Sequence, residues 1–184
     1  MLKLRSDYTP PSCRVLDARL NIDIHDDHTE VTTILSLERV SSAPFLLHGR
    51  DLELRSLRIG DAIIDKADWP LSEDGLLLAD LPEQVSVETV SICHPETNTA
   101  LEGLYLSGGM YCTQCEPEGF RRIGFYPDRP DVMTIFTVRI EAYQSFPHLL
   151  SNGNLVETGD VGSDRHFALW HDPHPKPAYL FACV

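Results

Sequence analysis

The stretch "VLDARLNIDIH", residues 15–25, decides the fold class of this chain. Apolar and polar residues alternate along it, and a period of two is typical of a strand with one buried face. The residues that we expect on the buried face are Leu16, Ala18, Leu20, Ile22 and Ile24. The polar turn "DDH" at 26–28 follows, and the alternation then resumes at Val31, Thr33, Leu35 and Leu37. The two segments therefore predict an antiparallel hairpin.

Short segments of the same kind recur along the chain, separated by Gly and Pro clusters. The longest, at 131–143, places Val132, Thr134, Phe136, Val138 and Ile140 on one side. The other predicted strands lie at 45–48, 52–59, 62–64, 75–80, 85–92, 166–172 and 178–184. No segment keeps a helical period, and only a single turn is expected near 127–132. We therefore predict an all-β fold, a sandwich or barrel-like assembly of sheets with little or no helix.

Length and composition indicate one globular domain. The chain has 184 residues, of which 42% are hydrophobic and 23% are charged, and a domain of this size buries enough surface to fold without a disulfide or metal. We take residues 1–184 as a single β domain. It ends on the apolar segment "AYLFACV" at 178–184, without a polar tail. We expect such an ending where a longer protein is cut at a domain boundary.

The charge excludes two classes of partner. The chain carries 28 acidic and 15 basic residues, with a formal net charge of −13. Nucleic acids and anionic membranes both require clustered Lys and Arg, so we expect neither as a partner. No apolar run approaches the roughly 20 residues of a membrane span, and the N-terminus lacks the apolar core of a secretory signal. The odd count of five cysteines favours free thiols in a reducing compartment, and we expect a cytoplasmic protein.

The stretch "YCTQCEPEGFR", residues 111–121, carries the candidate chemistry. Cys112 and Cys115 have the spacing of a zinc pair, and His171 and His174 would be the remaining two ligands. A thioredoxin-type redox pair is a second alternative, but no helical pattern follows Cys115 to lower a thiol pKa. Small apolar residues in a strand remain the simplest account of both thiols.

The carboxylates of the same stretch offer a third alternative. In an extended chain Gln114 and Glu116 share a face, while Tyr111, Thr113 and Cys115 would turn toward the core. Pro117 ends strand pairing, so Glu116 would lie at a strand end. A carboxylate beside an amide oxygen suits a cation such as a peptide's free amino group. Spacing alone, however, favours two solvated surface residues.

Longer motifs carry a resemblance to a known family. They are "NTALEGLY" (98–105), "MYCTQCEPEGFRRIGFYPDRPDV" (110–132), "LLSNGN" (149–154) and "WHDPHPKPAYLFA" (170–182). In order and spacing they resemble the N-terminal domain of bacterial aminopeptidase N, a gluzincin zinc metalloaminopeptidase. The resemblance extends from the hairpin near residue 15 to Val184. It implies a saddle-shaped antiparallel β domain that contacts the enzyme's own catalytic domain.

The resemblance also implies roles for two residues. Glu116 looks like the family's glutamate for the substrate's free α-amino group, and Gln114 looks like its companion at the first residue of the peptide. The family's His-Glu-x-x-His zinc motif is missing, since none of the 8 histidines stands in such an arrangement. We therefore expect no catalytic residue and no metal ligand here. Zinc would belong to the full-length enzyme, and this chain alone would be inactive.

A different class of function stays open beside this one. A free-standing β-sandwich module that binds protein or carbohydrate would also be all-β, and Trp69 or Trp170 would then have to face solvent. We expect both to pack in the core or at a domain boundary. Arg129 of "DRPD" is expected to tie turns together through carboxylates and carbonyls. Gly108 and Gly109 lack the Gly-Lys-Ser/Thr ending of a phosphate loop.

Overall fold

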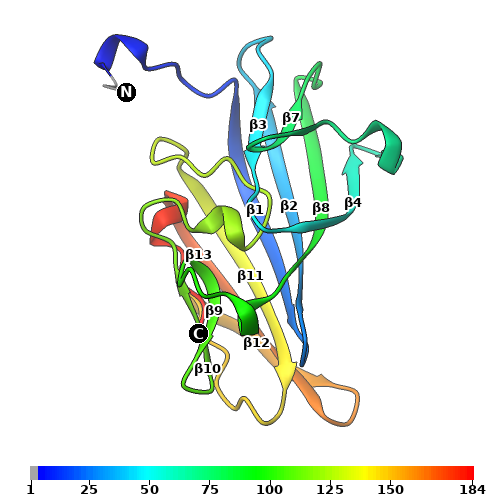
Figure 1. Cartoon of the computed structure of the whole chain (residues 1–184), viewed down its shortest axis with the longest axis vertical. Helices are drawn as coiled ribbons and strands as arrows, with labels where there is room; N and C mark the ends of the chain where they lie inside the picture. Colours follow the sequence, from blue (N-terminus) through cyan, green and yellow to red (C-terminus); the bar gives the residue numbers. More distant parts are fainter. Residues whose placement is uncertain (1–3) are drawn as a thin grey trace.

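The computed structural model describes residues 4–184 and confirms the all-β prediction (Figure 1). Its helical turns are five 3-10 turns of three residues each, and the described part of the chain contains no α-helix. None of those turns is long enough to cross a membrane. The strands are β1 Cys13–Ile24, β2 Thr29–Arg39, β3 Phe45–His48, β4 Glu53–Ile59, β5 Ala62–Ile63, β6 Leu71–Ser72, β7 Gly75–Leu78, β8 Gln84–Cys93, β9 Gly103–Ser107, β10 Met110–Gln114, β11 Thr134–Tyr143, β12 Asn154–Val161 and β13 Arg165–Lys176. The 3-10 turns are η1 Arg5–Asp7, η2 Lys66–Asp68, η3 Pro95–Thr97, η4 Phe120–Arg122 and η5 Ala178–Leu180.

Three sheets make up the fold. The largest has eight strands in the order β12-β13-β11-β1-β2-β8-β4-β5, and the smaller ones pair β10 with β9 and β3 with β7 and β6. All pairings are antiparallel except that of β1 with β11. That parallel pair joins two segments more than a hundred residues apart, so neither a turn nor a local pattern announces it.

The hydrophobic core confirms the predicted faces with one exception. The alternating residues of β2 and β11 are buried as expected, and so are Ala18, Leu20, Ile22 and Ile24 of β1. Leu16, predicted on the same face, is exposed by 49%. A β-bulge between Val15 and Asp17 shifts the register there, so Val15 faces the core in place of Leu16.

An aromatic cluster joins the large sheet to the segment that precedes β11. The ring of Phe120, in η4, lies 4.9 Å from Tyr126, 6.0 Å from Phe136 and 5.0 Å from Phe181 in edge-to-face contacts. Phe120 and Tyr126 are completely buried, and Phe136 contributes from the core face of β11. Such pairs add stability beyond the area that they bury. The cluster therefore fixes η4, at the end of the stretch of candidate chemistry, against the sheet.

The predicted strand at 178–184 is wrong. This segment forms η5 and then a single β-bridge between Ser151 and Cys183. Pro177 precedes it and cannot donate a ladder hydrogen bond, and the only strand-like backbone bonds join Leu150 and Val184 in both directions. The buried residues of this segment, Ala178, Phe181 and Cys183, pack into the core without forming a strand.

Two further differences concern β12 and β13. The exposed strand β12 was not predicted, since an edge strand with both faces in solvent lacks apolar alternation. β13 also extends beyond the predicted strand at 166–172 and continues through the "HDPHP" segment to Lys176. The register against β11 shifts between Thr134 and Phe136, so Pro173 and Pro175 lie in a bulge where their missing N–H groups break no ladder bond. The single turn predicted near 127–132 is present. A hydrogen bond from the Val132 N–H to the Arg129 carbonyl closes it.

Candidate functional site

The candidate residues lie at the end of the β9–β10 hairpin. Gln114 is the last residue of β10 and pairs with Gly103 of β9. The strand ends there, so the expected extended run through Glu116 is wrong, and Glu116 belongs to the turn that follows. The physical reason is a backbone hydrogen bond of 2.8 Å from the Gly119 N–H to the Cys115 carbonyl, which closes the turn.

Gly119 allows this turn to fold back onto the strand. A Cβ atom at this position would lie 2.2 Å from the carbonyl oxygen of Gln114 and 3.0 Å from the Cα of Cys115. Both neighbours are backbone atoms that cannot move aside, so only glycine fits. The turn is therefore held by close backbone packing before any side chain contributes.

Gln114 and Glu116 are both exposed to solvent. The Gln114 amide donates a hydrogen bond of 3.3 Å to the backbone carbonyl of Glu116, which keeps the two residues adjacent. No ion pair involves the Glu116 carboxylate within residues 4–184. Chemically, this is an accessible anionic group with an amide beside it, an arrangement able to accept hydrogen bonds from a cation.

The residues that lie between and beside Gln114 and Glu116 turn toward the core. Tyr111 and Cys115 are buried as expected, whereas Thr113 is half-buried and binds the backbone of Cys183. Burial raises the pKa of the Cys115 thiol well above its usual range, so this cysteine is neither a thiolate nor a nucleophile. Cys112 is half-buried, on the strand itself.

A buried ion pair fixes the other end of the turn. Arg121, in η4, donates from Nε and from its backbone N–H to Oδ2 of Asp128, each at 3.1 Å, and from Nη2 to the Asp128 carbonyl at 3.2 Å. The same guanidinium lies 3.1 Å from the carboxylate of Glu118, two residues after Glu116. Burial raises the pKa of the Asp128 carboxyl above its ordinary value, against the opposing effect of Arg121. Sequence reasoning missed this pair because Arg121 and Asp128 meet only once the chain has turned at Ile123 and Gly124.

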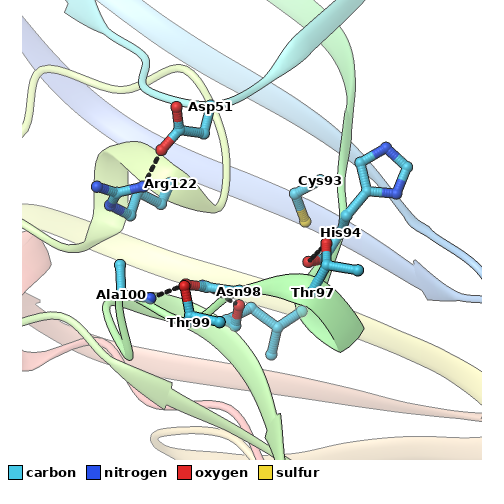
Figure 2. A pocket seen from close by; sticks show the side chains of 9 residues that line it. Asp51, Cys93, His94, Thr97, Asn98, Thr99, Ala100 and Arg122 are labelled. Carbon is cyan, nitrogen blue, oxygen red and sulfur yellow. Dashed lines mark hydrogen bonds and ion pairs between the residues drawn. The ribbon is translucent and has the colours of Figure 1, made fainter.

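The neighbouring cavity of about 280 Å³ is built from the other side of η4 (Figure 2). In Figure 2 the side chains of Arg122 and Asp51 face each other across from the 97–100 segment and His94. Its polar groups are already engaged: Arg122 pairs with Asp51 and with Glu102, and the Asn98 amide donates to two backbone carbonyls at 2.8 Å. Burial raises the pKa of the Cys93 thiol in its wall to about 12. This cavity therefore holds structural contacts rather than a catalytic set.

The zinc alternative finds no ligand set. The described residues contain no group of three or more His, Cys, Asp or Glu side chains able to hold a metal ion, so Cys112, Cys115, His171 and His174 do not form one. His171 instead contacts the Thr137 hydroxyl through Nδ1 at 3.0 Å. The described residues thus do not fit a structural zinc site of two cysteines and two histidines.

Three residues that we expected to have structural roles make structural contacts. Arg129 binds Asp131 through two nitrogens, at 2.7 and 2.8 Å, and reaches the Thr9 carbonyl at 2.8 Å. Trp69 and Trp170 pack against the core, and each indole N–H donates to a backbone carbonyl, at 3.0 and 2.9 Å. Neither indole is free to serve as a sugar platform.

Comparisons with known proteins agree with the all-β fold and with the resemblance that the sequence motifs carry. Residues 97–180 match the Peptidase M1 N-terminal domain. The chain is 44% identical to aminopeptidase N of Caulobacter vibrioides over 97% of its own length, and 44% identical to aminopeptidase N of Escherichia coli over 99%. It spans 21% of the length of each, about a fifth of these curated relatives.

Solved structures extend the match to the fold. The crystal structure of Legionella pneumophila aminopeptidase A, in complex with aspartic acid, is 32% identical with a TM-score of 0.91, over 98% of this chain and 22% of that one. An M1 zinc metallopeptidase from Deinococcus radiodurans, 15% identical, shares the fold with a TM-score of 0.79 over 94% of this chain and 42% of that one. These matches do not favour a free-standing binding module. These matches therefore place residues 97–180 of the chain in the Peptidase M1 N-terminal domain family, and nearly its whole length is similar to part of aminopeptidase N.

Proposed function

We propose that this domain anchors the free α-amino group of a peptide substrate in a zinc metalloaminopeptidase. Glu116 would supply the charge for the ammonium group, and the Gln114 amide would contact the first residue of the peptide. The observation that carries the proposal is the Glu116 carboxylate. It is exposed, has no ion pair with any residue of 4–184, and stands on a turn fixed at Gly119 and Arg121.

The anchor would set the register of the substrate. Holding the amino end in place brings the first peptide bond to a constant position, and such positioning accelerates a reaction without any chemistry by the anchor itself. A blocked N-terminus would leave the carboxylate desolvated and unpaired, which gives discrimination in favour of free amines. The domain by itself would be inactive, since the zinc of the full enzyme and its ligands would come from the catalytic domain.

The catalytic domain would contact the face around the β9–β10 hairpin. A largely apolar cavity of about 250 Å³ opens there, lined among others by Ile24, Met110, Phe146 and Val184. Met110, Leu150 and Val184 are exposed nearby, and exposed apolar residues that gather on one face favour a protein interface. The curated relatives are about five times as long as this chain, which supports a partner domain in the same polypeptide.

The proposed compartment is the cytoplasm. All five cysteines are free thiols, and Cys13, Cys93, Cys115 and Cys183 are buried. Free buried thiols are typical of proteins that fold under reducing conditions.

The experiment is a substitution in a full-length peptidase that carries this domain. Glu116→Ala should reduce kcat/KM for unblocked peptides by at least about tenfold, because a charge-assisted hydrogen bond contributes about 1.5–3 kcal/mol. Asp61→Asn, at an exposed acid in the turn between β4 and β5, is the matched control and should leave kcat/KM unchanged. Unchanged kinetics for Glu116→Ala, with zinc content intact, would remove the amine-anchor role.

A further inference from the structure

We infer that Arg121 is a positioning residue for amine recognition: it pairs with Glu118 and Asp128 and so leaves Glu116 as the one acid of the 116–122 segment that has no ion pair with a described residue and is open to a substrate cation. This inference rests on the proposed role of Glu116. The inference goes beyond that role, because it assigns the orientation and the selectivity of the anchor to a buried side chain that would never touch the substrate.

The carboxylates around η4 divide into paired and unpaired ones. Arg121 holds Glu118 and Asp128, and its neighbour Arg122 holds Asp51 and Glu102. Two adjacent arginines on one 3-10 turn thus engage four carboxylates. Within the described chain, the acid left without an ion pair in the 116–122 segment is Glu116.

The geometry of Arg121 fixes the turn as well as the charges. Its side chain is only 9% exposed, and that of Asp128 only 2%, so neither partner can exchange its contacts for water at low cost. The guanidinium reaches the Asp128 carboxylate, the Asp128 carbonyl and the Glu118 carboxylate at once, at 3.1–3.2 Å. The Arg121 carbonyl also accepts the Arg50 N–H at 2.8 Å. Both the turn and the neighbouring loop are therefore tied to one residue.

A lysine cannot replace this arrangement. Its ammonium is a point charge without the planar fork of donors, so it cannot hold all three oxygens in these directions. Arg121→Lys keeps the charge but should release Glu118, which is 59% exposed and would then stand as a second free carboxylate near Glu116. The turn would also lose a contact that limits its movement.

The test compares two inhibitors that differ only in an amino group, in a full-length peptidase that carries this domain. L-leucinol has the free amine, and 4-methylpentan-1-ol lacks it, so the ratio of their inhibition constants measures amine recognition alone. Arg121→Lys should lower this ratio by about tenfold, the size of a lost charge-assisted contact. Arg129→Lys is the matched control, since Arg129 pairs with Asp131 outside the turn, and it should leave the ratio unchanged.

Two more variants separate the inference about Arg121 from the proposed function of Glu116. Glu118→Gln changes an exposed residue and should not impair folding. It breaks the ion pair that holds the turn but adds no free carboxylate, so it should lower the ratio less than Arg121→Lys does, by about threefold, the size of an exposed ion pair. Glu116→Gln tests the anchor itself: if it leaves the ratio unchanged, the proposed function fails. If Glu116→Gln abolishes the preference but Arg121→Lys and Glu118→Gln match the Arg129→Lys control, the inference about Arg121 is overturned and the anchor stands. If Arg121→Lys does not fold, the ratio measured for Glu118→Gln decides: a ratio equal to that of the Arg129→Lys control overturns the inference about Arg121.

Discussion

The hydroxyl of Thr113 binds both backbone groups of Cys183, donating to its carbonyl at 3.2 Å and accepting its N–H at 2.9 Å. Thr113 lies on β10 next to Gln114, and Cys183 is completely buried near the other end of the chain. One side chain thus replaces a ladder pair that the 178–184 segment does not form. The strand that carries the candidate site is thereby tied to the last residues of the domain.

Thr113→Val should lower the free energy of unfolding by about 2 kcal/mol, because it leaves a buried N–H and a buried carbonyl without partners. The shape of the side chain is nearly unchanged, so packing contributes little to the loss. Chemical unfolding of the purified chain measures the effect. Thr97→Val is the control, since that hydroxyl makes one exposed bond of 3.3 Å to the His94 carbonyl, and a loss as large as that of Thr113→Val would contradict the assignment.

His48 should make stability fall on mild acidification. Burial lowers the pKa of His48, with a further contribution from the charge of Arg121, and Nδ1 accepts the Asp128 N–H at 3.2 Å. The pKa is lower in the folded state than its unfolded value of about 6.5. The stability contribution is therefore present above pH 6.5 or so and is lost as the pH falls toward the folded pKa, by at most about 1.4 kcal/mol per pH unit.

His48→Gln should flatten this dependence, since the amide oxygen can still accept a hydrogen bond but does not titrate. Unfolding free energies measured between neutral and mildly acidic pH give the slope directly. His148 is exposed, and His148→Gln should keep the slope of the unsubstituted chain. Equal slopes for His48→Gln and the unsubstituted chain would show that another group titrates.

Gly119→Ala should disturb the turn that carries Glu116. The added Cβ would meet backbone atoms of Gln114 and Cys115 at 2.2 and 3.0 Å, so the turn has to move rather than a side chain. We expect at least about 2 kcal/mol of lost stability. In a full-length peptidase with this domain, we also expect a loss of amine selectivity as large as that of Glu116→Gln.

Gly108→Ala separates this effect from a general cost of replacing glycine. No atom lies within 4 Å of a Cβ at Gly108, although its φ of +60° is unfavourable for alanine. It should cost about 1 kcal/mol and leave amine selectivity intact. If both substitutions give the same selectivity, the shape of the Gly119 turn has no part in recognition.

The cysteines should differ sharply in reactivity. Burial raises the pKa of Cys183 to about 12, as it does for Cys93, and it raises that of Cys115 even further. In the folded chain at neutral pH a small thiol reagent should therefore modify Cys112 first, and the buried thiols only after unfolding. Mass spectrometry of the labelled peptides checks the order. Equal labelling of Cys112 and Cys115 would revive the redox alternative.

Local patterns predicted the strands that have one buried and one solvated face. The segment at 45–48 is β3 as expected, and the buried residues of β2 and β11 follow from their alternation. The same rule failed where its physical basis is missing. β12 is exposed on both faces, and the bulge before Asp17 reverses the alternation for Leu16.

The candidate residues were available from the sequence, but their arrangement was not. Motifs in the chain point to Gln114 and Glu116, yet strand geometry through Cys115 gave the wrong backbone, because the turn closed at Gly119 ends β10 early. "DRPD" likewise suggested one cluster around Arg129. The structure divides it, since Asp131 pairs with Arg129 and Asp128 with Arg121.

Sequence alone determined the class of fold and the identity of the exposed acid, because alternation and motif spacing are properties of neighbouring residues. Tertiary structure decided which carboxylates around η4 are paired with an arginine, and that Glu116 is not one of them. That choice depends on Arg121 reaching Asp128 in a buried environment, where an ion pair is held because water cannot replace it. Contacts of this kind form only when distant segments pack together, as β1 does with β11 and Thr113 with Cys183.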